Sequence, residues 1–214
     1  MAEPPALVQL PVFDTATKIA GTWMADALLK SPEDKWEVLL DEECVRPIVQ
    51  RELTANHEYF WGLGHGRPDR FSGWLKQPVI DEANLTALRG KVAHLFSCLT
   101  GQRLGKLLVE RGGAKAFIGY RKRYIIGLAV DPRPSSDYSY ALARLDTIMG
   151  EAILKGYSVR EAKAIHDRAF QILVEYFRED PWAPLILRAL VHNHDALVLY
   201  GDEGARPCPR EGAR

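Results

Sequence analysis

Short apolar runs alternate with helical periodicity along the first two thirds of the chain, a pattern typical of a sheet with crossover helices. The apolar runs predict strands at residues 6–13, 36–40, 58–63, 91–96 and 115–120, with a further candidate at 124–130. The intervening patterns predict helices at residues 15–29, 41–53 and 100–111 and a loop at 67–78. Asp14 and Thr15 are candidate N-caps for the first helix.

The composition changes at residues 131–136, where Asp, Pro, Arg and Ser predict a linker or loop. Beyond it, periodicity predicts helices at 138–155, 158–177 and 182–192, and Ser158 with Glu161 fits a capping box. The apolar residues 196–200 indicate one more strand. We therefore divide the chain into a core at 1–130, a helical extension that ends in this strand at 131–200, and a disordered tail at 201–214.

The chain has 214 residues, 47% hydrophobic and 26% charged, which suits one α/β domain with an extension. Its 28 basic and 28 acidic side chains cancel, so no global field favours nucleic acid or an anionic membrane. The N-terminus lacks a signal-peptide pattern, and no run approaches the roughly 18 apolar residues that span a bilayer. We therefore expect a cytoplasmic protein that binds neither nucleic acid nor membrane.

Cysteine and histidine spacing gives little support to a metal site. The three cysteines are scattered and contain no C-x-x-C pair, which argues against disulfides and structural zinc: Cys44, Cys98 and Cys208. Three histidines are interpreted as structural or exposed: His57, His94 and His166. His192 and His194 could in principle share a metal, but no Cys or carboxylate cluster accompanies them in the sequence. We expect no metal and no cofactor.

Two candidate catalytic residues follow successive apolar strands. The run at 59–63 leads to His65 between two glycines, and the run at 92–96 leads to Ser97 and Cys98. Parallel sheets place their ligand sites beyond the carboxyl ends of the strands. If the two strands are neighbours, His65 and Cys98 emerge side by side. Taken singly, a Cys at a strand end is usually a small core residue, and Gly-His-Gly is commonly a turn.

The surroundings of these two residues suit acyl transfer. Cys98 comes just before a predicted helix, whose N-terminal dipole favours the thiolate. His65 can protonate a leaving amine and then activate water. The amides of Gly66 and Cys98 would form an oxyanion hole, in which each donor is worth roughly 3 kcal/mol.

From the Gly-His-Gly and Ser-Cys strand ends to the Gly-Ala-Lys-Ala-Phe-Ile-Gly-Tyr stretch at 113–120, the sequence resembles the caspase, gingipain and clostripain group of cysteine peptidases. It resembles the gingipain-like and CHAT-type bacterial members most. The likeness follows the order of elements over residues 6–130 and is specific over 59–120. It implies a His65/Cys98 dyad without an obligatory third residue, and an α/β three-layer sandwich with a mainly parallel sheet of about six strands.

The resemblance also implies cleavage after a charged residue. Asp69 is a candidate for selecting a basic residue and is slightly favoured, whereas Arg121 and Arg123 would select an acidic one. Each of the three could equally be a solvated surface charge.

The sequence leaves three candidate functions. The first is a cysteine endopeptidase acting on protein or peptide substrates. The second is an interaction module of a signalling or defence assembly, with residues 138–192 as the partner surface. A flavodoxin-like nucleotide binder is disfavoured, because no Gly-x-Gly-x-x-Gly or phosphate loop follows the first strand.

Overall fold

The computed structural model describes residues 5–130, 133 and 135–208. Its centre is a six-stranded sheet in the order β2-β1-β3-β7-β8-β9, parallel except for β9, which runs antiparallel to β8. The strands are β1 (Ala6–Leu10), β2 (Trp36–Leu40), β3 (Tyr59–Leu63), β7 (Val92–Phe96), β8 (Ala116–Tyr120) and β9 (Leu197–Gly201). Every residue of β1, β3, β7 and β8 is buried, as expected for parallel strands covered on both faces.

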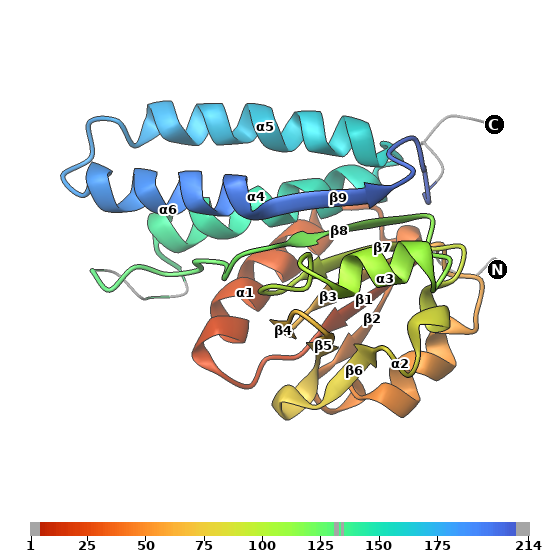
Figure 1. Ribbon diagram of the computed structural model, residues 1–214. Helices are drawn as coiled ribbons and strands as arrows, with labels where there is room; N and C mark the ends of the chain where they lie inside the picture. The colour runs from red at the N-terminus through yellow and green to blue at the C-terminus, as the bar shows by residue number, and fades with distance from the viewer. Residues whose placement is uncertain (1–4, 131–132, 134, 209–214) are drawn as a thin grey trace.

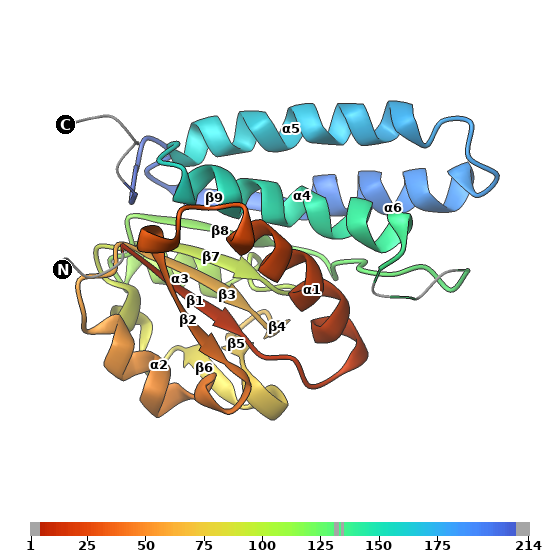
Figure 2. The ribbon, with the colours of Figure 1, turned by 180° about the vertical axis from the view of Figure 1, so that it is seen from behind.

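Helices cover both faces of the sheet, so the protein is an α/β three-layer sandwich (Figures 1 and 2). One face carries α1 (Thr15–Leu29) and α4 (Asp137–Leu154), and the other carries α2 (Arg46–Leu53) and α3 (Leu104–Glu110). Helices α5 (Val159–Tyr176) and α6 (Ala183–Ala196) pack with α4, and α5 lies farthest from the sheet (Figure 1). No helix in the described part of the chain is long and apolar enough to cross a membrane.

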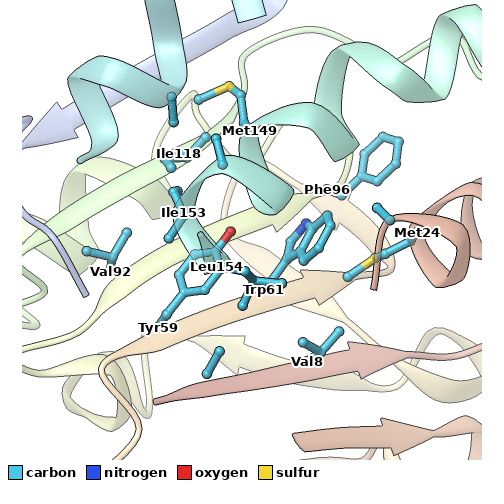
Figure 3. Close-up of a cluster of buried hydrophobic side chains, with 14 of the residues drawn as sticks. Val8, Met24, Tyr59, Trp61, Val92, Phe96, Ile118, Met149, Ile153 and Leu154 are labelled. Atoms are coloured by element: carbon cyan, nitrogen blue, oxygen red, sulfur yellow. The ribbon is translucent and has the colours of Figure 1, made fainter. Parts of the chain in front are cut away.

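Side chains alternate between the two faces because successive strand residues point in opposite directions. In β3, Tyr59 and Trp61 join the cluster under α1 and α4, whereas Phe60 joins the cluster under α2 and α3. Figure 3 shows Tyr59 and Trp61 beside Ile153 and Leu154 of α4. The expected last strand is β9, at the edge of the sheet.

Several element boundaries differ from those expected. The first strand ends at Leu10, and residues 124–130 form no strand. Helix α2 begins only at Arg46, with Pro47 in its first turn, after the short 3-10 helix Asp41–Glu43. Helix α3 begins at Leu104, because the chain turns through residues 99–103 first, with Leu99 at a φ of +64°.

The expected loop at 67–78 contains part of a second sheet. Its strands are β4 (His65–Arg67), β5 (Arg70–Ser72) and β6 (Pro78–Asp81), in antiparallel order. They are short and rich in charged or polar residues, so they show no alternation that sequence reading could detect. Phe71, Val79 and Ile80 bury this sheet against the α2 and α3 side of the core.

The tail is ordered as far as it is described, contrary to the expectation of disorder from residue 201. Ala205 and Cys208 are buried in the main core. The carbonyls of Ala205 and Glu203 accept hydrogen bonds from Val159 N (3.1 Å) and Arg160 N (2.8 Å). The first amides of a helix have no acceptors within the helix, and here the carbonyls of the tail are the acceptors for α5. Residues 209–214 lie outside the described part.

Candidate active site

The ends of β3 and β7 bring His65 and Cys98 to one edge of the sheet, as the sequence predicted. The two strands are parallel neighbours with Leu63 opposite Phe96. Gly64 N continues the pairing by donating to Phe96 O at 3.4 Å. Gly66 then passes so close to Cys98 that a Cβ at this position would collide with the Cys98 carbonyl oxygen. His65 and Cys98 line the same cavity.

Asp14 binds the histidine. Its Oδ2 lies 2.7 Å from His65 Nε2, and the two side chains keep 29% and 32% of their exposure. Burial disfavours the charged carboxylate, but hydrogen bonds from Thr17 N and His65 outweigh it and lower the pKa of Asp14. A neutral imidazole that donates from Nε2 keeps its lone pair on Nδ1, so Asp14 selects the tautomer with a free base on the other side of the ring.

Asp14 also caps α1, which is the role that the sequence indicated for it. Its side chain accepts a hydrogen bond from Thr17 N at 3.0 Å. The Thr17 hydroxyl in turn accepts from Asp14 N at 3.1 Å, which completes a capping box. Sequence reasoning missed its contact with His65. The signal was present in principle, because Asp14 follows the strand β1, and β1 pairs with β3 in parallel.

Cys98 is half-buried and its sulfur accepts a hydrogen bond from Tyr124 N at 3.3 Å. The expected support from a helix dipole is absent, since α3 begins at Leu104 and residues 99–103 intervene. The Tyr124 amide is a different source of stabilisation for a thiolate, because a donor to the charged form favours that form.

A buried amide in α6 fixes the segment that carries Tyr124. Asn193 Oδ1 accepts from Ile125 N at 2.8 Å, and Asn193 Nδ2 donates to Ile125 O at 2.7 Å. His192 Nε2 lies 2.8 Å from Arg123 O in the same segment. Asn193 therefore acts on the site through the backbone, and no sequence pattern marks it out.

The candidate specificity residues lie elsewhere. Asp69 is exposed in the turn between β4 and β5, and Arg121 and Arg123 are exposed beyond β8. None of these three lines the cavity that His65 and Cys98 share. The carbonyls of the two arginines are used structurally, accepting from Gln102 Nε2 (2.9 Å) and from His192.

The other cysteines are unsuited to nucleophilic chemistry. Cys44 and Cys208 are both fully buried in the core. Burial raises the pKa of each thiol to about 12, which leaves almost no thiolate near neutral pH. Cys98 is the half-buried exception among the three.

His192 and His194, which are close in the sequence, do not form a joint site. His194 instead lies beside His166 and Asp167, and one ligand atom from each of these three comes within 4.8 Å of the others. Asp167 accepts from both rings, at 3.2 Å from His166 and 3.1 Å from His194. Lys163 Nζ already lies 2.6 and 2.7 Å from the two carboxylate oxygens, so a cation is built into this cluster.

No protein-family model matches the chain, and no curated protein sequence matches it. Solved structures do share its fold. The Arg-specific cysteine proteinase gingipain R (RgpB) superposes with a TM-score of 0.61 at 12% identity, over 94% of this chain and 46% of that one. A complex of the pro- and mature domains of Porphyromonas gingivalis RgpB gives 0.58 at 13% identity, over 93% and 47%. A structure described only as a protease gives 0.64 at 12%, over 98% and 49%.

The chain thus has the caspase-like fold of gingipain R and spans about half the length of each of these three structures. At this level of identity, the likeness concerns the fold.

Proposed function

We propose that this chain is a cysteine peptidase unit with Cys98 as nucleophile and His65 as general acid and base. The observation that carries the proposal is the meeting of His65 and Cys98 at one cavity, with Asp14 holding the far side of the imidazole. The fold shared with cysteine proteinases supports it. Membership of the gingipain-like or CHAT-type group, a cytoplasmic location and a protein or peptide substrate belong to the same proposal.

The geometry suggests a two-step reaction. The Cys98 thiolate attacks the carbonyl carbon of the scissile bond, which forms a C–S bond and an oxyanion near the amides of Gly66 and Cys98. The imidazolium of His65 donates a proton to the leaving nitrogen, and the C–N bond breaks to leave a thioester. Neutral His65 then takes a proton from water, the resulting hydroxide attacks the thioester, and the C–S bond breaks to restore the thiolate.

Asp14 contributes by orienting His65 rather than by reacting. Its carboxylate fixes the tautomer in the neutral state and stabilises the imidazolium when the ring is charged. Asp14 is therefore a positioning residue in this scheme. It adds a third member to the expected dyad.

The proposal is tested by digesting a peptide library with wild type, Cys98→Ala and His65→Ala, and by locating the thiol that a peptidyl electrophile modifies. We expect full turnover only in wild type, none in Cys98→Ala, and modification at Cys98 but not at Cys44 or Cys208. His65→Ala should lose about 10²- to 10⁴-fold in turnover, the usual contribution of a general acid and base. Wild-type turnover in either variant would disprove the dyad.

An exposed apolar surface favours a second candidate, the interaction module. Ile172 and Tyr176 of α5 keep 62% and 71% of their exposure and line a groove with residues of α4. Such a surface suits a protein partner. One structural neighbour is a complex of a pro-domain with its mature protease, which supports association with a protein chain. The module predicts no turnover and a Cys98 no more reactive than the thiol of free cysteine.

A further inference from the structure

The cavity beside the candidate dyad lies between α1, the ends of β3 and β7, and the segment around Tyr124. Cys98 and His65 form one part of its wall. Most of the remaining lining is apolar or aromatic, from Ala16, Ala20, Leu63, Phe96, Tyr124 and Ile126. The same elements that position the dyad therefore also shape this hollow.

The lining contains no lysine, arginine, aspartate or glutamate. Its hydroxyl groups belong to Thr17, Ser97 and Tyr124, and all three are engaged. Thr17 bonds to Asp14, Ser97 to Thr100 Oγ1 at 3.1 Å, and Tyr124 donates to the Leu142 carbonyl. Asp14 itself is occupied by His65 and Thr17. Apart from the dyad itself, the hollow offers no charged group to pair with a charged substrate side chain, whose desolvation would then be strongly unfavourable.

The hollow has a volume of about 100 Å³. For scale, a water molecule occupies about 30 Å³ and an engineered apolar cavity of about 150 Å³ binds benzene. An aliphatic side chain fits this range better than a large aromatic one. Apolar walls also favour such a side chain by removing its surface from water.

The reaction places one particular side chain here. The Cys98 sulfur must reach the carbonyl carbon of the residue before the scissile bond, and the Cβ of that residue is only two bonds away from this carbon. A cavity with Cys98 in its wall is therefore within reach of that side chain.

We infer that this cavity receives the side chain before the scissile bond, and that the protein cleaves after small aliphatic residues such as valine or leucine. The inference rests on the proposed function. It replaces the expectation of cleavage after a charged residue, because Asp69, Arg121 and Arg123 do not line the cavity.

The test uses peptidyl acyloxymethyl ketones that differ only in the last residue: Val, Leu, Phe, Arg or Asp. The rate of Cys98 modification is measured by intact-mass spectrometry, with iodoacetamide as a reagent that has no side chain to recognise. We expect Val or Leu to react at least about 10-fold faster than Arg or Asp, within the range of one apolar pocket's discrimination.

Two variants change the cavity in opposite ways. Ile126→Ala enlarges it and should shift the preference toward Phe. Ala16→Asp adds a carboxylate in the first turn of α1, where acidic residues are compatible with the helix, and should raise the Arg rate relative to Leu about 10-fold or more. Thr15→Asp is the matched control, since it adds the same charge at the neighbouring position, which does not line the cavity.

The outcomes separate the inference from the function on which it rests. Fastest reaction with Arg or Asp, or equal rates across the panel, would overturn the aliphatic specificity and leave the peptidase proposal standing. If iodoacetamide modifies Cys98 but no peptidyl ketone reacts, both fall. An equal gain in the Arg rate in Ala16→Asp and Thr15→Asp would show that charge near the site, rather than the cavity, sets the preference, and would also overturn the inference.

Discussion

Two of the protein's histidine–aspartate pairs lie at neighbouring strands of the main sheet, one just beyond β3 and one within β7, and their surroundings give them different roles. His65 follows β3 and lies 2.7 Å from Asp14, whereas His94 lies within β7 and is 3.0 Å from Asp146. The first pair keeps about a third of its side-chain exposure and shares a cavity with Cys98. The second pair is completely buried.

The buried pair forms part of a hydrogen-bonded network in the core. Asp146 of α4 accepts from Tyr120 Oη at 2.7 Å and from Trp61 Nε1 at 3.4 Å, besides His94. The other nitrogen of His94 meets Tyr59 Oη at 2.7 Å. Burial raises the pKa of Tyr59 and Tyr120 well above the ordinary value, and the Asp146 charge adds to the effect. Every polar group is matched, which ties α4 to three strands.

Residue identity alone therefore does not decide the roles of His65 and His94. Both histidines have a carboxylate on one nitrogen, but only His65 can offer the other nitrogen to a substrate. Tyr59 occupies that position on His94. Exposure and the neighbouring thiol decide between catalysis and core structure.

The largest effect should come from Asp146→Ala. Removal of the carboxylate leaves His94, Tyr120 and Trp61 without their shared acceptor in the core. Breaking a buried pair in this way costs about 3–5 kcal/mol in free energy of unfolding. Urea unfolding measures it, and Asp146→Asn, which keeps an acceptor oxygen, should lose less. A loss within 1 kcal/mol of zero for Asp146→Ala, on the order of an exposed pair, would contradict the network.

Asp14→Asn should show the reverse behaviour, with activity lost and stability kept. Asparagine caps a helix about as well as aspartate, but it removes the charge that stabilises the His65 imidazolium. Loss of the carboxylate costs about 10⁴-fold in serine-based triads, where the histidine must deprotonate the nucleophile. A thiolate needs less help, so we expect kcat to fall only about 10- to 100-fold.

Asp14→Ala is the companion variant, because it removes the charge and the cap together. It should lose the same activity as Asp14→Asn and about 1 kcal/mol of stability in addition. Wild-type kcat in Asp14→Asn would mean that Asp14 serves α1 alone.

Much of the site was predictable because apolar runs reveal buried parallel strands, and such strands end at a common edge. The adjacency of His65 and Cys98 follows from that rule once β3 and β7 pair. The contact of Asp14 with His65 depends on strand order, since β1 lies beside β3 but far from it in sequence. Thr100 and Gly101 resemble a helix start, but the left-handed Leu99 and the turn after it delay α3 to Leu104.

Other features had no local signal at all. The partners of Asn193 are the backbone atoms of Ile125, 68 positions earlier in the chain. The tail residues Ala205 and Cys208 are ordered by burial and by the free amides of α5. Such contacts depend on tertiary packing, which overrides local composition.

Asn193→Ala tests whether Asn193 of α6 holds the segment whose Tyr124 amide donates to Cys98. The variant leaves the amide and carbonyl of Ile125 without partners, at a cost of about 1–3 kcal/mol in stability. If the Tyr124 amide is displaced from Cys98, the rate of iodoacetamide alkylation at pH 7 should fall about 10-fold, the value of one hydrogen bond to a charged group. Asn193→Asp keeps only the acceptor, so its alkylation rate should lie between those of wild type and Asn193→Ala. Unchanged alkylation would limit Asn193 to stability.

The smallest effect concerns a third histidine, His166, which is buried like His94 but less completely paired. Its pKa is lowered to about 4, mainly by burial, to which the His194 ring and Lys163 add and which Asp167 partly opposes. In the unfolded chain the group has a pKa of about 6.5. Below that pH the unfolded chain binds a proton that the folded protein does not, so stability is complete above about pH 6.5 and falls as the pH drops toward 4.

At pH 5.5 this difference amounts to about 1 kcal/mol of lost stability. Urea unfolding at pH 7.5 and 5.5 should show the loss in wild type and a smaller one in His166→Gln, which cannot titrate. The carboxyls with lowered pKa values, Asp14, Glu151 and Asp167, lose their contribution only at lower pH, so they do not obscure this window. An equal loss in both proteins would mean that His166 takes up its proton in the folded state as readily as an exposed histidine does, and that burial alone does not keep an incompletely paired histidine neutral.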